Sequence, residues 1–161
     1  MKLFLVLFNI FHFSSSDWVK EMENPGLFQG DILLNPEQQS NMKAGKYPFA
    51  LTKKNFWPKQ IAYAIDKGLE GYPAALRAIQ EAIDDYERYT CLRFVKRTTE
   101  YSYMWFYNSG QGCFSAVGKQ GGKQGISLSS GCWYKGVAIH EMMHALGKKC
   151  YDVKSRRLRI V

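Results

Sequence analysis

Two histidines and a glutamate near the end of the chain could carry out metal chemistry. His140 and His144 are four positions apart, and Glu141 follows the first of them in the stretch VAIHEMMHALG. On a helix, side chains at positions i and i+4 point the same way, so the two imidazoles could bind one Zn2+ ion. Zinc lowers the pKa of a bound water to about 7, and Glu141 could accept its proton as a general base. The spacing therefore predicts a hydrolytic zinc site with one ion per chain.

An alternative interpretation is that these are two ordinary helix histidines, because so short a motif also arises by chance. The chain has three histidines, and the third, His12, lies in an apolar run at the N-terminus. Every histidine beyond that run therefore belongs to the motif, which favours the metal interpretation.

Gly147 and Cys150 extend the motif toward a third ligand. A glycine three positions after His144 can adopt the left-handed turn that ends a helix and returns the chain to the metal. The position where a third histidine would be expected holds Cys150. A thiolate binds zinc well, so Cys150 is a candidate third ligand, although such a cysteine can instead oxidise or pair with another thiol.

Helices and strands must position these side chains. The motif falls on a predicted helix over residues 136–147 that ends in glycine. A second helix is predicted from about Pro73 to Tyr89, where apolar residues recur at helical spacing. Strands are predicted at residues 61–65, 91–95, 101–108 and 125–129. The intervening residues 109–125 contain six glycines and are predicted to be mostly loop.

The N-terminus predicts export from the cell. Lys2 precedes an apolar run over residues 3–13, and three serines follow, which is typical of a secretory signal peptide over residues 1–16. A buried N-terminal strand or helix is the alternative. Because no other stretch is long and apolar enough to span a bilayer, we expect a secreted, extracellular protein with no membrane partner. Residues 17–54 show little periodicity and are predicted to be a loosely ordered segment or linker.

The net charge of +8 is concentrated near the C-terminus. Residues 148–161 carry six Lys or Arg residues and one Asp, a net +5, which leaves +3 for the rest of the chain. We therefore expect no nucleic-acid partner, and a binding module that uses the basic tail on a polyanion is the weaker alternative. The four cysteines allow three pairings in an oxidising compartment and show no C-x-x-C spacing.

Further stretches of the sequence accompany the metal motif. YTCLRFVKRTTE, SGQGCFSAVGK and GKQGISLSSGC occur in this order before IHEMMHALG. Together they resemble the astacin family of secreted zinc metalloendopeptidases (metzincins), with some stretches closest to arachnid members. The resemblance covers roughly residues 56–147, the N-terminal part of the family's catalytic domain. It implies an α+β fold: a zincin-like N-terminal subdomain with a twisted mixed sheet and two main helices, the C-terminal subdomain being absent.

The resemblance also implies an inhibited precursor. NPGLFQGD is similar to the family's propeptide motif F-x-G-D, whose aspartate binds the zinc in the precursor, and that aspartate here is Asp31. A plain loop aspartate after a glycine is the alternative. The family pairs the equivalents of Cys113 and Cys132 in a disulfide, and it pairs the equivalent of Cys91 with a cysteine farther along the chain.

These inferences divide the chain into four parts: a signal peptide (1–16), a propeptide (17–50), the N-terminal half of a peptidase domain (51–147) and a divergent basic tail (148–161). We expect a monomer that acts on protein or peptide substrates, with residues 125–129 as the edge strand that binds an extended substrate. Because the tail lacks the family's third histidine, methionine turn and transition-state tyrosine, we expect little or no activity from this chain alone. A secreted, non-catalytic fragment is the alternative.

Overall fold

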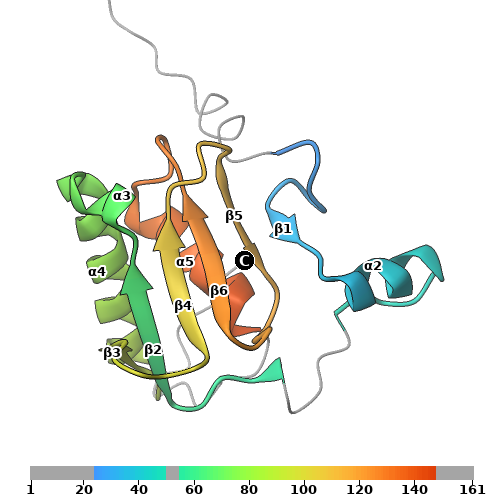
Figure 1. Ribbon diagram of the computed structural model, residues 1–161, viewed down its shortest axis with the longest axis horizontal. Coiled ribbons are helices and arrows are strands. Elements are labelled where there is room, and N and C mark those ends of the chain that lie inside the picture. Colours follow the sequence, from blue (N-terminus) through green and yellow to red (C-terminus); the bar gives the residue numbers. More distant parts are fainter. Residues whose placement is uncertain (1–23, 50–54, 148–161) are drawn as a thin grey trace, which may run out of the picture.

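The computed structural model describes residues 24–49, here called the leading segment, and residues 55–147, here called the main body (Figure 1). The predicted signal peptide, the basic tail and Cys150 lie outside the described residues. Along the chain the elements are β1 (Ile32–Leu33), α2 (Pro36–Lys43), β2 (Gln60–Ile65), α3 (Lys67–Glu70), α4 (Pro73–Tyr89), β3 (Arg93–Lys96), β4 (Tyr103–Tyr107), β5 (Cys113–Ala116), β6 (Lys123–Leu128) and α5 (Lys135–Leu146).

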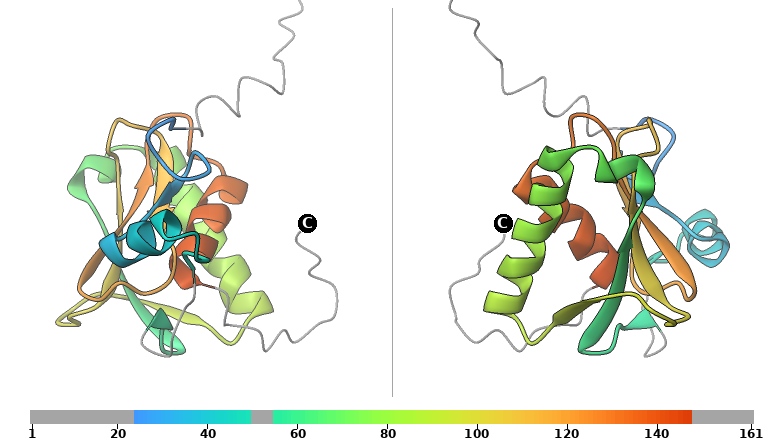
Figure 2. Two further views of the ribbon diagram at one scale, coloured as in Figure 1. Left: turned by 90° about the vertical axis from the view of Figure 1, so that its right-hand side faces the viewer. Right: turned by 60° about the vertical axis from the view of Figure 1, so that its left-hand side comes forward.

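All six strands form one sheet in the order β1-β5-β6-β4-β2-β3. Strand β5 runs antiparallel to β6, and the other neighbouring pairs are parallel. Helices α4 and α5 pack together on one face of this sheet, while α2 lies to one side (Figure 2). The structure thus has the predicted α+β fold, with a mixed sheet and two main helices.

Helix α4 has the bounds that its sequence predicts. Pro73 opens the helix, where the missing backbone N–H costs nothing. Its buried residues recur at intervals of three and four positions and form one apolar face: Ala75, Ala78, Ile79, Ala82 and Ile83. Burial of this face against the sheet, rather than intrinsic helix propensity, therefore holds α4 in place.

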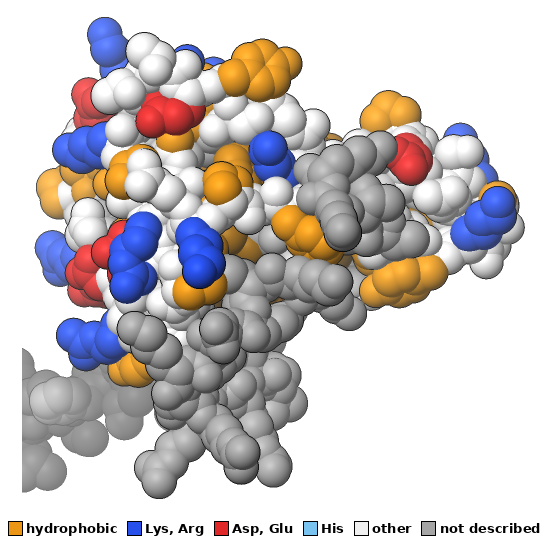
Figure 3. All heavy atoms as spheres, turned by 90° about the horizontal axis from the view of Figure 1, so that it is seen from below, with side chains coloured by type: hydrophobic (Ala, Val, Ile, Leu, Met, Phe, Trp, Pro, Cys, Tyr) orange, Lys and Arg blue, Asp and Glu red, His pale blue; other side chains and the backbone are white. Residues whose placement is uncertain are grey.

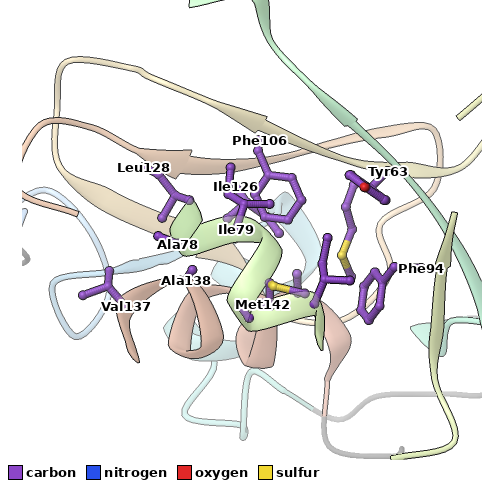
Figure 4. Packing of buried hydrophobic residues seen from close by; sticks show 14 of the residues in the cluster. Tyr63, Ala78, Ile79, Phe94, Phe106, Ile126, Leu128, Val137, Ala138 and Met142 are labelled. Atoms are coloured by element: carbon purple, nitrogen blue, oxygen red, sulfur yellow. The ribbon is translucent and has the colours of Figure 1, made fainter. Parts of the chain in front are cut away.

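The core lies between the sheet and these two helices. Phe106 of β4 and Ile126 and Leu128 of β6 point toward Ile79 of α4 and Met142 of α5 (Figure 4). These side chains are all buried, and each contributes about 1.5–3 kcal/mol of transfer free energy. Because α5 is part of this core, its position relative to the sheet is fixed by packing.

The prediction that residues 125–129 form an edge strand is wrong. Residues 125–128 belong to β6, which lies between β5 and β4 inside the sheet, and Ser129 follows its end. Within the main body, the edge strand next to β6 is β5, which lies in the region predicted to be loop. All four residues of β5 are buried, so its sequence shows none of the alternation that reveals a half-exposed strand.

The leading segment is more ordered than its sequence predicts, because it contains β1 and α2. Helix α2 has little apolar character, but its start forms a capping box. The side chain of Asn35 accepts a hydrogen bond from the Gln38 N–H, and the side chain of Gln38 accepts one from the Asn35 N–H. The stretch Asn-Pro-Glu-Gln is the sequence signal that could have predicted this helix.

The described residues include no helix that is both long and apolar enough to cross a bilayer.

Candidate metal centre

Helix α5 brings His140 and His144 to one face, as their spacing predicts. The imidazole Nε2 atoms lie 3.0 Å apart. The helix ends at Gly147, whose φ of +69° is the left-handed conformation that glycine adopts without strain. The Gly147 N–H donates to the carbonyls of His144 and Met143, which closes the last turn.

Asp31 completes a group of three metal-ligand side chains. Its Oδ2 lies 2.7 Å from the His140 Nε2 and 3.4 Å from the His144 Nε2. The carboxylate comes from the leading segment, just after a turn in which Gln29 and Gly30 both have positive φ. It is the only such group of three that the described residues contain. The structure therefore brings together three of the residues that the sequence singled out.

The three atoms have a spacing that fits a zinc ion. Tetrahedral zinc with bonds of about 2.0–2.1 Å to nitrogen or oxygen places its ligand atoms roughly 3.3 Å apart. The separations here, 2.7, 3.0 and 3.4 Å, are close to that value. Two nitrogens and a carboxylate oxygen are also a donor set that zinc accepts. The residues present thus fit the metal.

Electrostatics link the carboxylate to the imidazoles. Partial burial raises the pKa of Asp31, but its hydrogen bonds to His140 and His144 outweigh burial and hold that pKa well below its usual range. The hydrogen bond to Asp31 is also the main reason that the pKa of His140 is raised. The site therefore favours a negative charge on Asp31 facing a protonated His140.

Glu141 is fully buried beside the two histidines. Neither carboxylate oxygen has a hydrogen-bond partner among the described residues. Burial raises the pKa of this carboxyl to about 8. A nearby divalent cation would favour the ionised form again. A buried carboxylate without a partner costs stability, which points to a chemical role for it rather than a structural one.

Strand β5 connects this helix to the leading segment through Ser115. Its backbone N–H donates to the Asp31 carbonyl at 3.0 Å, and its side-chain hydroxyl donates to the Glu141 carbonyl at 2.7 Å. Strand β1 pairs with β5 in parallel, with Ile32 opposite Ser115. Ser115 does not stand out in the sequence, because nothing around it indicates a contact with residues so far along the chain.

Other contacts fix the end of α5. The Trp57 indole N–H donates to the Ala145 carbonyl at 2.9 Å, and the Gly118 N–H donates to the His144 carbonyl at 2.9 Å. A disulfide joins Cys113 in β5 to Cys132 just before α5, with Cα atoms 5.8 Å apart. This is the pairing that the family resemblance implies. Both ends of α5 are thus held, the start by the disulfide to β5 and the end by the bonds from Trp57 and Gly118.

A helix that carries H-E-x-x-H and packs against a mixed sheet is typical of zinc metallopeptidases of the zincin type. The sequence model of the peptidase family described as Astacin matches residues 49–159. The chain therefore belongs to the astacin family of zinc metalloendopeptidases. The match continues past Gly147 into residues 148–159, which belong to the segment predicted to be a divergent basic tail.

Known relatives agree with this assignment. The chain is 38% identical over 130 residues to zinc metalloproteinase nas-6 of Caenorhabditis elegans, a region that covers 79% of this chain and 37% of that protein. It is 37% identical to blastula protease 10 of Paracentrotus lividus, covering 74% of this chain and 22% of that protein. The chain thus spans well under half the length of these relatives.

A solved structure shows the same fold. High choriolytic enzyme 1, a hatching-enzyme zinc protease from Oryzias latipes, superposes with a TM-score of 0.56 and 34% sequence identity. The superposition covers 62% of this chain and 52% of that one.

Proposed function

We propose that this chain is the precursor of a secreted astacin-type zinc endopeptidase, held inactive by its own leading segment acting as a propeptide. The observation that carries the proposal is the Asp31 carboxylate, 2.7 and 3.4 Å from the two Nε2 atoms. Membership of the astacin family supports the zinc and the hydrolytic chemistry. The apolar N-terminal run supports secretion.

Each residue has a defined role in this proposal. His140 and His144 bind one Zn2+ ion, and Asp31 is an additional ligand in the precursor. When bound, zinc supplies a Lewis acid and a water whose pKa is about 7. Glu141 accepts a proton from that water and returns it to the leaving amine of the peptide, a contribution on the order of 10²–10⁴-fold. Cys150 stays a candidate for the third ligand position.

The leading segment would prevent catalysis in two ways. The Asp31 carboxylate occupies the position beside the two histidines that a water or a peptide carbonyl would need for catalysis. Strand β1 also occupies β5, the strand on which an extended peptide could form main-chain hydrogen bonds. Protein or peptide substrates would therefore need the leading segment to move away.

The activity itself is proposed for a longer polypeptide. The chain spans 37% of the length of nas-6, and we expect residues 1–161 alone to show little or no peptidase activity. Structural zinc sites are worth about 10–16 kcal/mol in total, so each ligand contributes roughly 3 kcal/mol, or about two decades of affinity. We expect His140 and His144 without further ligands to lose zinc on dialysis.

Zinc affinity of purified protein tests this proposal. In competition with a chromophoric chelator, Asp31→Asn should bind zinc about a hundredfold more weakly than the natural chain. Asp66→Asn is the matched control, because Asp66 caps α3 away from the site and asparagine caps equally well. Equal zinc affinity in all three proteins would contradict the role of Asp31.

Glu141→Gln separates catalysis from metal binding. In a chain extended with a family-like C-terminal half, this variant should keep its zinc and lose gelatin cleavage by at least about a hundredfold. Unchanged cleavage would assign the hydrolysis to another site. A chain that neither binds zinc nor cleaves after extension would favour the non-catalytic alternative.

A further inference from the structure

We propose that a second contact holds the leading segment on the main body independently of the metal site. This contact, here called the glutamine latch, joins Asn35 and Gln38 at the start of α2 to the loop after β5, through Val117 and Gln120. The inference rests on the proposed precursor function, because it concerns how the propeptide is retained. It assigns to residues 117–120 the role of a docking surface whose partner is the chain's own residues 24–49.

Backbone pairing alone gives the leading segment little support. Strand β1 has two residues, and their partners on β5 are Ser115 and Ala116. Pairings this short are not stable without side-chain contacts. Something besides β1 must therefore keep the leading segment in place whenever Asp31 is not bound to a metal.

Apolar contacts across the boundary are also few. A small cluster, separate from the main core, contains Ile32, Leu34 and Val117, with Phe28 and Phe49 packed against it. Four of these five side chains belong to the leading segment, and Val117 alone belongs to the main body. Most of this cluster therefore stabilises the leading segment internally.

Polar side chains provide further contacts. One is exposed: the Asn24 Nδ2 donates to the Gln111 carbonyl at 3.2 Å. The other two are more buried and form the latch. The Asn35 Nδ2 donates to the Gln120 Oε1 at 2.6 Å, and the Gln38 Nε2 donates to the Val117 carbonyl at 3.3 Å. Gln38 is 5% exposed, unusually buried for a glutamine on an otherwise exposed helix. Its Oε1 accepts from the Asn35 N–H in the capping box, so its amide is held with the Nε2 toward Val117.

The receiving loop is built by the main body alone. The Gln120 Nε2 donates to the carbonyls of Val117 and Gly118, which leaves its Oε1 to receive Asn35. Gln124, 3% exposed, accepts from the Gln120 N–H and donates to the Gly118 carbonyl. None of these bonds involves the leading segment. The docking surface is therefore preorganised, which lowers the entropy cost of binding to it.

Retention without the metal follows from this arrangement. Loss of zinc, or of the Asp31 carboxylate, removes one anchor and leaves the latch, the small apolar cluster and the exposed hydrogen bond from Asn24 to Gln111. The leading segment then stays on β5 and still covers the edge that a substrate would use. A cut in the chain after α2 would likewise leave the segment bound until the latch opens. Seen from below, the leading segment projects beside the main body, in accord with attachment along one side (Figure 3).

Hydrogen exchange of the intact 161-residue chain, followed by mass spectrometry, tests the latch. The Ser115 amide is the reporter, because it donates to the Asp31 carbonyl across the boundary. The test variant combines Asn35→Asp with Gln38→Glu. Both replacements keep the acceptors of the capping box, so α2 can still form, but they remove the two donors of the latch. Gln39→Glu is the control, because the Gln39 amide bonds to the Leu34 carbonyl within the leading segment.

With EDTA present, the natural chain and Gln39→Glu should keep the Ser115 amide protected. The double variant should exchange it about tenfold faster or more, with unchanged protection in β4 and α4. Without EDTA, the Asp31→Asn variant should protect the Ser115 amide as well as the natural chain does. Two results would contradict the latch. One is full loss of Ser115 protection in the natural chain when EDTA is added, and the other is a double variant that protects Ser115 as well as the natural chain does. Failure of the precursor proposal would instead appear as absent zinc affinity, and the comparison in EDTA does not depend on zinc.

Discussion

The main body and the leading segment are held by different kinds of contact. The main body buries a continuous core between the sheet and two helices, and a disulfide crosses it. The leading segment contributes four side chains to a small apolar cluster and otherwise depends on polar bonds to β5 and to the loops on either side of it. Polar bonds exchange readily with water, whereas core packing does not. One chain thus combines a part that should unfold as a unit with a part that can leave without unfolding the rest.

A core truncation should have the largest effect and should unfold the main body. Phe106 is 0% exposed and packs against Tyr63 and the helices. We expect Phe106→Ala to lower the free energy of unfolding by about 3–5 kcal/mol, because the cavity cannot be refilled. Urea denaturation followed by tryptophan fluorescence measures this change.

Phe28→Ala is the matched control in the leading segment. Phe28 packs against the small cluster, and its loss should change the unfolding of the main body much less. Equal destabilisation by the two variants would show that the two regions unfold together, contrary to the comparison.

A change on the opposite face of the sheet should have an intermediate effect. Gly125 of β6 lies opposite Trp105, and a Cβ at this position would come within 2.8 Å of the Tyr107 ring. The Tyr107 ring stacks on the Trp105 ring, with the two ring centroids 4.4 Å apart. The Lys123 Nζ lies 3.2 Å from the Trp105 ring centroid. Gly125→Ala should therefore displace Tyr107 and cost about 1–3 kcal/mol.

Gly136→Ala is the control for this change. A Cβ at Gly136, in the first turn of α5, would meet no atom within 4 Å. Alanine there should stabilise the helix by roughly 0.5–1 kcal/mol, because glycine loses more backbone entropy on folding. The midpoint temperature of thermal unfolding should therefore fall for Gly125→Ala and rise for Gly136→Ala. A shift in the same direction would show that the Tyr107 ring adapts to the added methyl.

The sequence predicts the main body better than the leading segment, for a physical reason. Helices α4 and α5 follow from patterns that are local in the chain: apolar spacing, an opening proline and a closing glycine. Strand β5 is buried on all sides and lies between glycine-rich turns, so its pattern is weak. Helix α2 is stabilised by a capping box rather than by an apolar face, and periodicity does not reveal it.

The residues of the candidate site also fall into two groups, those that a local pattern predicts and those that it does not. His140, Glu141 and His144 follow from spacing on one helix. Asp31 was identified by resemblance, since its role depends on a chain reversal that no local pattern encodes. Contacts such as Asn35 with Gln120 join residues 85 positions apart, and their meeting depends on how β1 docks on β5. Sequence alone supplies no register for a two-residue strand.

The smallest expected change in the free energy of unfolding comes from an isoleucine-to-alanine substitution in the leading segment. Comparing it with the same substitution in the main body distinguishes the two regions most directly. Ile32 is 4% exposed in the small cluster, and Ile61 is 0% exposed in the main core. The same substitution to alanine at each position removes the same atoms. Ile61→Ala should lower the free energy of unfolding of the main body by about 2–5 kcal/mol.

Ile32→Ala should change that global free energy by less than about 0.5 kcal/mol, because the leading segment separates before the main body unfolds. Its cost should appear locally, as exchange of the Ser115 amide about thirtyfold faster, equivalent to about 2 kcal/mol of lost packing. Urea denaturation and hydrogen exchange on the same samples measure the two quantities. If Ile32→Ala instead lowered global stability as much as Ile61→Ala, the leading segment would be an integral part of the fold rather than a separable one.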